Sequence, residues 1–431
     1  MDVFRVLRGH YLLLFGVAVI LHLLLAYYAP DPNGYVYDFY SKAIILFFEN
    51  GQLPEPGACF VCYHPPLLTL IGGGIFHVVE WLGGDRHAQL FSVALVLNSL
   101  SLVFSIYTFA IYRHYRKDES LDFILWALLL FLPVAFVSAF SIESDMLGST
   151  LIVISTYYFI RFLNEENYSD LVLSALFIAL AAATKYTGAI IAVYFGGVLL
   201  ARYLRHFEIQ QLKQGLVYAG VAILVGSYPY INNIKETGHP IIGNVAWDTA
   251  KSYPELYDFT SFSIWDVVRV FEDSRAIELN SFKAFNTEVL TSHYGQLWTD
   301  FTIFSRAKRH GQWHQAGFYT GKYMPSWLLW TLLIAGLVPV IAGFSGFFAL
   351  AISREATLLL GMFVLSIAVY IAWFIGHYEW MLKTKYHLYL IPLWLIAINK
   401  AASCVPASIA RAMLAPAVIF SAIYCFFFAV F

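Results

Sequence analysis

Ionisable side chains in this 431-residue chain gather at the ends of otherwise apolar segments. Such groups are costly at membrane depth, so each of these positions is a candidate functional site. Asp38, in Tyr37-Asp38-Phe39-Tyr40, precedes a segment that ends near Gly51 and is expected to form an interfacial helix. A carboxylate there could act as a general base toward a hydroxyl. The structural alternatives are a salt bridge to Lys42, four residues further on, and a charge at the helix start that the helix dipole favours.

A second acidic position lies at the junction of two apolar segments, in residues 141–146. It contains Glu143 and Asp145, both carboxylates at the expected membrane surface. The alternative is that Ser144 or Asp145 caps the helix that follows, because both residue types accept hydrogen bonds from the first backbone amides.

Two lysines occupy comparable positions. Lys185 lies between two short apolar segments, and Lys385, followed by Tyr386, precedes a late one. Cations in a pocket of low dielectric strongly stabilise negative charge that develops in a reaction. The alternative is that both side chains simply extend to the lipid headgroups.

The loop before His64 contains Cys59 and Cys62, which form a C-x-x-C pattern. If that loop faces an oxidising compartment, the pattern favours a local disulfide. A metal site with His64 and a pair of unbonded thiols are the alternatives. His64 is followed by Pro65-Pro66-Leu67, and because prolines suit the first turn of a helix, they predict a helix entry there.

The amino-acid composition indicates the kind of fold that holds these residues. The chain is 60% hydrophobic and 13% charged, with a mean hydropathy of +0.67, whereas soluble domains carry roughly 25% charged residues. A hydrocarbon core of about 30 Å requires roughly 20 helical residues, and many apolar runs approach that length. The sequence therefore predicts an all-α polytopic membrane protein. A net charge of −2 argues against a nucleic-acid partner.

About eleven membrane-spanning helices are expected. They cover residues 11–28, 90–112, 121–141, 146–163, 170–184, 188–202, 216–231, 325–351, 357–376, 387–400 and 411–431. Cytoplasmic loops are enriched in Lys and Arg, so Arg5 and Arg8 place the N-terminus inside. The basic loop 113–117 is then cytoplasmic only if residues 67–82 form a juxtamembrane helix that does not span.

This topology divides the chain into three parts. Residues 1–231 form an N-terminal catalytic membrane module with a first outer loop at 30–84, residues 232–324 form a large outer cap, and residues 325–431 form the last helices. The chain contains no internal repeat. This weakens a transporter interpretation, since many transporters are built from repeated halves.

The order of these motifs resembles the GT-C superfamily of lipid-carrier-dependent glycosyltransferases, which includes protein O-mannosyltransferases and the aminoarabinose transferase of lipid A. Six motifs follow in register: Asp38, His64-Pro65-Pro66-Leu67, Asp145, Lys185-Tyr186-Thr187-Gly188, Pro229-Tyr230-Ile231-Asn232-Asn233 and Lys385-Tyr386. There are two departures from the family pattern. Asn232 stands where many relatives have Arg, and Lys385 stands in place of an Arg, whose fork a lysine cannot reproduce.

The resemblance implies inverting transfer of a sugar from a polyprenyl-phosphate carrier to a glycan, lipid or protein acceptor on the outer face. It implies Asp38 as the base, and Asp145, His64, Lys185, Lys385, Tyr386 and Asn233 as substrate-binding residues. Some relatives use a divalent metal ion and others do not, so Asp38 and His64 are also metal candidates. The expected location is the bacterial inner membrane, with the active site facing the periplasm. A transporter or flippase of lipid-linked sugars, and a membrane scaffold without activity, are the competing interpretations.

Overall fold

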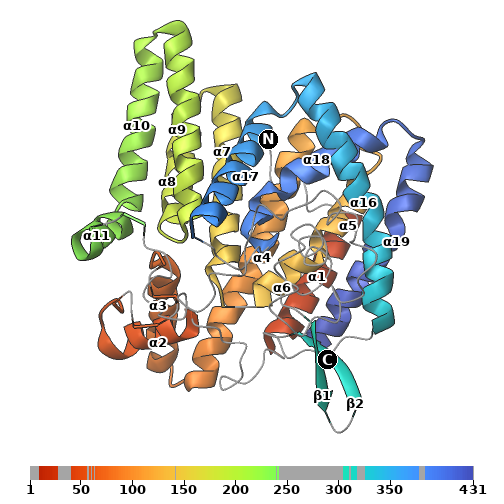
Figure 1. Ribbon diagram of the computed structural model, residues 1–431, viewed down its shortest axis with the longest axis horizontal. Helices are drawn as coiled ribbons and strands as arrows, with labels where there is room; N and C mark the ends of the chain where they lie inside the picture. The colour runs from red at the N-terminus through yellow and green to blue at the C-terminus, as the bar shows by residue number, and fades with distance from the viewer. Residues whose placement is uncertain are drawn as a thin grey trace.

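The computed structural model describes residues 9–27, 40–55, 58–59, 61–62, 64–140, 142–238, 240–241, 304–309, 312–317, 326–377 and 384–430. Within them the chain forms a bundle of helices, as expected (Figure 1). The predicted base, Asp38, lies outside the described residues.

In the first half of the chain the helices are α1 (His10–Tyr27), α2 (Tyr40–Asn50), α3 (Leu67–Trp81), α4 (Arg86–Tyr115), α5 (Asp122–Leu130), α6 (Pro133–Phe140), α7 (Ser144–Glu165), α8 (Tyr168–Ala182), α9 (Tyr186–His206), α10 (Ile209–Gly226) and α11 (Tyr228–Thr237). The second half contains α16 (Ser326–Ser353), α17 (Thr357–His377), the 3₁₀ helix η6 (Thr384–Leu390), α18 (Ile391–Ala402) and α19 (Ala407–Val430).

Every apolar segment predicted to span the membrane is helical, but the predicted count of eleven spans is not confirmed. Among the described residues, seven helices are long and apolar enough to cross a membrane, or eight if a bent pair counts as one span. The apolar parts of α8, α17 and α18 are shorter than this criterion requires, as is α3, the predicted juxtamembrane helix. The chain is therefore a multi-pass membrane protein.

Two predicted helices are interrupted at prolines. The segment 121–141 divides into α5 and α6 because Pro133 lacks the N–H that would continue the hydrogen-bond ladder. The segment 216–231 begins earlier, at Ile209, and ends at Gly226, after which the axis bends by 56° into α11. Pro229 lies in the first turn of α11, where a missing N–H is tolerated.

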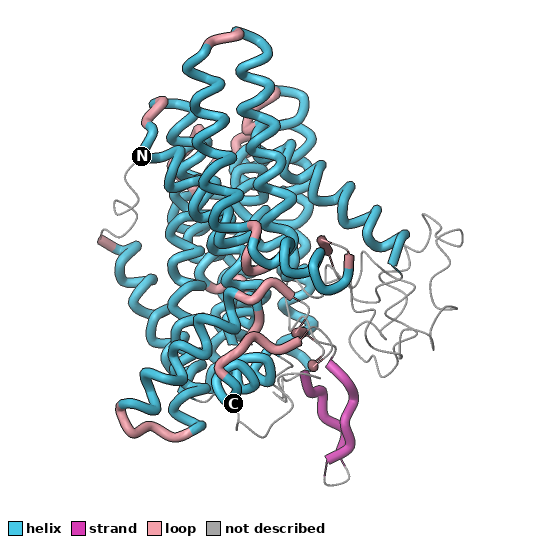
Figure 2. Tube along the Cα trace, turned by 90° about the vertical axis from the view of Figure 1, so that its left-hand side faces the viewer, coloured by secondary structure: helices cyan, strands magenta, loops and turns pink. Residues whose placement is uncertain are grey.

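A two-stranded antiparallel hairpin was not anticipated from the sequence. Strand β1 (Phe304–Arg309) pairs with β2 (Gln312–Gly317), with Phe304 opposite Gly317 and Arg309 opposite Gln312. The hairpin belongs to the predicted outer cap and projects beyond the helices at one end of the bundle (Figure 2).

The centre of the bundle is formed by α5, α6 and α7. The most apolar window of α7 is 83% buried, against 22% for the corresponding window of α9 and 28% for that of α1. A helix that is enclosed in this way positions its ends accurately, because its packing leaves little room to shift. The N-terminal end of α7 carries Ser144 and Asp145.

The tight contact between α8 and α9 depends on one glycine. A Cβ atom at Gly188 would lie 2.3 Å from the carbonyl carbon of Ala181, so any larger residue would force the backbones apart. Gly188 lies in the first turn of α9. This helix begins at Tyr186, directly after Lys185. The close approach therefore fixes the turn that presents Lys185.

At the opposite end of the bundle, charged residues connect three loops and helix ends. Glu355, between α16 and α17, accepts hydrogen bonds from Lys117 at 2.6 Å and from Lys400 at 2.9 Å. Nearby, Arg116 pairs with Asp122 at 3.1 Å. This is the end at which the sequence predicted the cytoplasmic basic loops.

Candidate functional site

An ion pair joins the start of α7 to the start of α9. The Nζ atom of Lys185 donates to Oδ1 of Asp145, and the two side chains are only 14% and 6% exposed. Lys185 therefore does not merely extend to the headgroups, the structural alternative considered for it. Removing charges from water is costly unless they are paired, so the pair keeps both ionised groups inside the protein.

The histidine loop and α2 meet the same end of α7. The ring of His64 stacks on Tyr40 with 5.6 Å between centroids and an interplanar angle of 21°. The hydroxyls of Tyr40 and Ser144 are hydrogen-bonded at 2.7 Å. Tyr40 therefore links His64 to Ser144, the residue directly before Asp145.

This arrangement corrects the capping hypothesis for the start of α7. The N-cap position is Glu143, and its side chain makes no capping hydrogen bond. Ser144 and Asp145 already lie inside the helix, and their side chains bond to Tyr40 and Lys185 instead. The side chains of Ser144 and Asp145 therefore bind residues of other elements instead of capping α7.

Tyr186 connects the remaining described residues to the cluster. Its ring lies 6.3 Å from that of His64 and 5.9 Å from that of Tyr230. Asn233, on α11, donates through Nδ2 to the Tyr186 hydroxyl at 3.3 Å and to the carbonyl of Pro240 at 3.1 Å. The fifth motif therefore reaches the site through Asn233.

The structure brings together Asp145, Lys185, His64 and Asn233 of the predicted residues. Lys385 and Tyr386 lie in η6, which packs against α7, but their side chains are outside the described part of the structure. Asp38 is also outside it, two residues before Tyr40 in the sequence.

Three site residues were not predicted: Tyr40, Ser144 and Tyr186. Ser144 and Tyr186 stand directly beside Asp145 and Lys185, and Tyr40 lies two residues after Asp38. Adjacency was the available signal, because a tyrosine beside a buried charge supplies a hydroxyl and a ring face at once.

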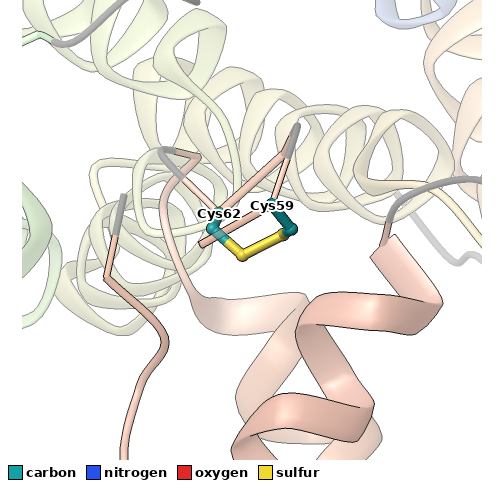
Figure 3. Close-up of a disulfide and its surroundings, with 2 residues drawn as sticks. All are labelled: Cys59 and Cys62. Carbon is teal, nitrogen blue, oxygen red and sulfur yellow. A yellow bond between two sulfur atoms is a disulfide. The ribbon is translucent and has the colours of Figure 1, made fainter. Parts of the chain in front are cut away.

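Cys59 and Cys62 form a disulfide in the loop before His64, which is the pairing that the sequence favoured (Figure 3). The amide of His64 donates to the carbonyl of Val61 at 3.0 Å, within that loop. Among the described residues, no group of three or more His, Cys, Asp and Glu side chains is arranged to hold a metal ion. Of the two metal candidates, only His64 belongs to that part of the chain.

Comparison with known proteins places this geometry in a family context. Residues 64–230 match the family described as dolichyl-phosphate-mannose-protein mannosyltransferase. No curated protein matches the sequence. ArnT from Cupriavidus metallidurans, in the apo state, shares the fold with a TM-score of 0.53 and 12% identity, over 98% of this chain and 76% of that one.

A second solved structure is the oligosaccharyltransferase of Archaeoglobus fulgidus in complex with Zn and sulfate. It aligns over 96% of this chain with a TM-score of 0.49 and 13% identity. The present chain spans about half of its length, 53%.

The family match and the shared fold confirm the predicted resemblance to the GT-C superfamily. The matched region contains His64, Asp145 and Lys185, three residues that the structure gathers at one end of the bundle. The family that matches residues 64–230 is a mannosyltransferase family, and glycosyl transfer is the activity that the sequence predicted.

Proposed function

We propose that this protein is an inverting glycosyltransferase that moves a sugar from a polyprenyl-phosphate carrier to an acceptor hydroxyl on the outer face of the membrane. The observation that carries the proposal is the buried ion pair of Lys185 and Asp145. It places a cation beside a carboxylate at the end of the bundle where the His64 loop, α2 and α11 converge.

The reaction needs both charges. As the acceptor oxygen bonds to the anomeric carbon, the bond from that carbon to the phosphate oxygen breaks, and the lipid phosphate leaves with an additional negative charge. A fixed cation with little access to water stabilises that charge strongly. Lys185 serves this role, assisted by Lys385 from η6.

The two residues of the ion pair bind different parts of the substrates: Lys185 the phosphate, and Asp145 a sugar or acceptor hydroxyl. When the donor phosphate binds Lys185, the Asp145 carboxylate is no longer fully engaged by its partner and accepts hydrogen bonds from sugar or acceptor hydroxyls. Asp38 takes the proton that the acceptor hydroxyl loses. In this scheme Asp145 orients a hydroxyl and Asp38 removes the proton.

The aromatic and amide groups complete the proposed binding site. His64, held on Tyr40, contacts the donor phosphate or a divalent cation, and Asn233 holds Tyr186 against the site. Where a divalent cation is bound, it would further neutralise the phosphate. Tyr386 contributes to donor binding next to Lys385.

The decisive experiment replaces the proposed base. Purified wild-type protein and the Asp38→Asn variant are each incubated with a polyprenyl-phosphate hexose. A cell extract that contains the glycan, lipid or protein acceptors is added. We expect transfer by the wild type and a loss of roughly 10²–10⁴-fold in the variant, because an amide cannot accept the proton. Undiminished transfer by Asp38→Asn would refute the assignment of the base.

The control is donor binding, which Asp38→Asn should leave nearly unchanged. Lys385→Met should weaken donor binding and slow turnover, whereas Lys385→Arg should be tolerated because Arg binds phosphate through two parallel hydrogen bonds. A flippase would move the intact lipid between leaflets and release no glycosylated product, so product analysis separates the two functions.

A further inference from the structure

A buried polar group deep in the bundle connects three helices close to the site. His22 on α1 donates from Nδ1 to Oδ1 of Asn98 on α4, at 2.8 Å. The two residues are 4% and 1% exposed. Polar side chains buried among apolar helices are costly unless their hydrogen bonds are made, and these two side chains bond to each other and, through Asn98, to backbone carbonyls.

The amide of Asn98 donates toward the turn that precedes Asp145. Its Nδ2 atom bonds to the carbonyl of Ala94, within α4, and to the carbonyl of Ala139, 3.2 Å away on α6. The last carbonyls of a helix have no partner within it, and Ala139 is in the last turn of α6. Asn98 therefore satisfies a helix end that is fully buried.

The other side of the same turn is also held by α4. The hydroxyl of Thr150, in the second turn of α7, lies 3.3 Å from the carbonyl of Leu100 and 2.7 Å from the carbonyl of Met146. Asn98 and Leu100 are two residues apart on α4. One short section of α4 thus contacts the chain before the α6–α7 turn and again after it.

His22 fixes the orientation of this connection. Its Nδ1–H can bond only to the carboxamide oxygen of Asn98, which leaves the amide nitrogen directed at Ala139. Its ring also lies 4.8 Å from Phe136 on α6. The contacts from α1 therefore reach the same helix end twice, once through Asn98 and once directly.

We infer that His22 and Asn98 are positioning residues for the Asp145–Lys185 pair: with the Thr150 contact, they hold the end of α6 and the start of α7, which presents Asp145, against one section of α4. The catalytic part of this inference rests on the proposed function. The structural part does not, because it concerns only how α4 holds the end of α6 and the start of α7.

The primary test is hydrogen–deuterium exchange of the full-length protein in detergent, which requires no substrate. In Asn98→Ala, amides in residues 137–147 should exchange faster, because the last turn of α6 loses its partner, while those of α10 should not change. His22→Ala is the second variant: it keeps the amide of Asn98 but removes the group that orients it, so a smaller change at the same residues is expected.

The matched control is Ser155→Ala. Ser155, on α7, donates to the carbonyl of Ser174 at 2.8 Å, so this change also removes one buried contact between helices. It should leave residues 137–147 unaffected. If Asn98→Ala accelerates exchange along all of α4 and α7 alike, or changes nothing, the residues serve general stability and the inference is wrong.

Kinetics of sugar transfer provide the second readout. Displacing a reacting group by about 1 Å can reduce turnover by roughly 100-fold. Asn98→Ala should therefore lower kcat by about 10- to 100-fold, with little change in the KM for the polyprenyl-phosphate hexose and normal kinetics in Ser155→Ala. A kcat like that of the control would overturn the catalytic part. If Asn98→Ala accelerates amide exchange at residues 137–147 but the wild type transfers no sugar, only the proposed function is refuted.

Discussion

The backbone amide of Leu67 donates a hydrogen bond to the carbonyl of Ala183, 2.9 Å away. Leu67 is the first residue of α3, directly after the two prolines, and Ala183 follows the last residue of α8. The bond joins the entry of the juxtamembrane helix to the turn that leads into Lys185. Two motifs more than a hundred residues apart are thereby held together by the backbone, whatever their side chains are.

The ion pair predicts an unusual combination of stability and activity. Lys185→Met leaves the carboxylate of Asp145 buried without its cation, and breaking a buried pair costs on the order of 3–5 kcal/mol. The double variant Lys185→Met/Asp145→Leu removes both charges and should regain most of that stability while remaining inactive. Thermal unfolding in detergent, measured beside transfer rates, tests this.

If the Lys185→Met variant is as stable as wild type, the ion pair contributes nothing to folding. If the double variant transfers sugar normally, neither residue belongs to the site.

The glycine run 72–74 predicts a contrast between neighbouring positions. A Cβ at Gly73 would lie 2.2 Å from the Phe47 ring on α2, whereas one at Gly74 would meet nothing within 4 Å. Overpacking costs about 1–3 kcal/mol, while alanine in a helix gains up to about 1 kcal/mol over glycine. Gly73→Ala should therefore lower the melting temperature, and Gly74→Ala should maintain or raise it. Equal melting temperatures would show that α2 yields to the added methyl group.

The cluster around Glu355 predicts an acid-sensitive contribution to stability. Hydrogen bonds from Lys117 and Lys400 hold the pKa of the Glu355 carboxyl below its usual value. The pKa is thus lower in the folded than in the unfolded state. The contribution is fully present above the ordinary glutamate pKa of about 4.3 and is lost as the pH falls through the lowered value.

The measurement is the melting temperature of wild type, Glu355→Gln and the exposed control Glu80→Gln between about pH 7 and pH 3, across the ordinary carboxyl range. Glu355→Gln should lie below wild type at neutral pH and converge with it in acid. A constant difference at all values of pH would show that the charge of Glu355 is irrelevant.

The basic loops predict which end of the bundle faces the cytoplasm. The α9–α10 connection and α3 lie at opposite ends of the bundle (Figure 1). Glu208 belongs to that connection and Glu80 to α3, and both are exposed. In a Cys404→Ser background, a membrane-impermeant thiol reagent added outside intact cells should label Glu80→Cys and not Glu208→Cys. Labelling of Glu208→Cys alone would invert the orientation and place the Asp145–Lys185 pair inside.

The helices were predictable because a long apolar segment in lipid must make its backbone hydrogen bonds within itself, and an α-helix does so. The interruption at Pro133 was also readable in principle, because the proline falls within the expected segment 121–141. The β1–β2 hairpin was not, since its strands contain charged residues such as Arg306 and Lys308 and lie in a long polar region. Strand pairing there depends on partners that local patterns do not identify.

The members of the site were largely predictable, but their connections were not. Asp145 and Lys185 stood out as charges at helix ends, and the sequence placed both on the same side of the membrane. Their direct pairing depends on how closely α7, α8 and α9 pack, which Gly188 permits through its contact with Ala181. Contacts of this kind are properties of three helices at once and have no local signature.

The bend between α10 and α11 has a consequence for where the chemistry takes place. On α11, Ile231 and Ile234 remain 48% and 49% exposed, while Asn233 turns inward to Tyr186. A helix of this character rests at the boundary between acyl chains and headgroups. Because Asn233 links α11 to Tyr186, we expect the position of Tyr186 to follow that of α11. Under the proposed function, the rate of sugar transfer should then depend on the thickness of the bilayer.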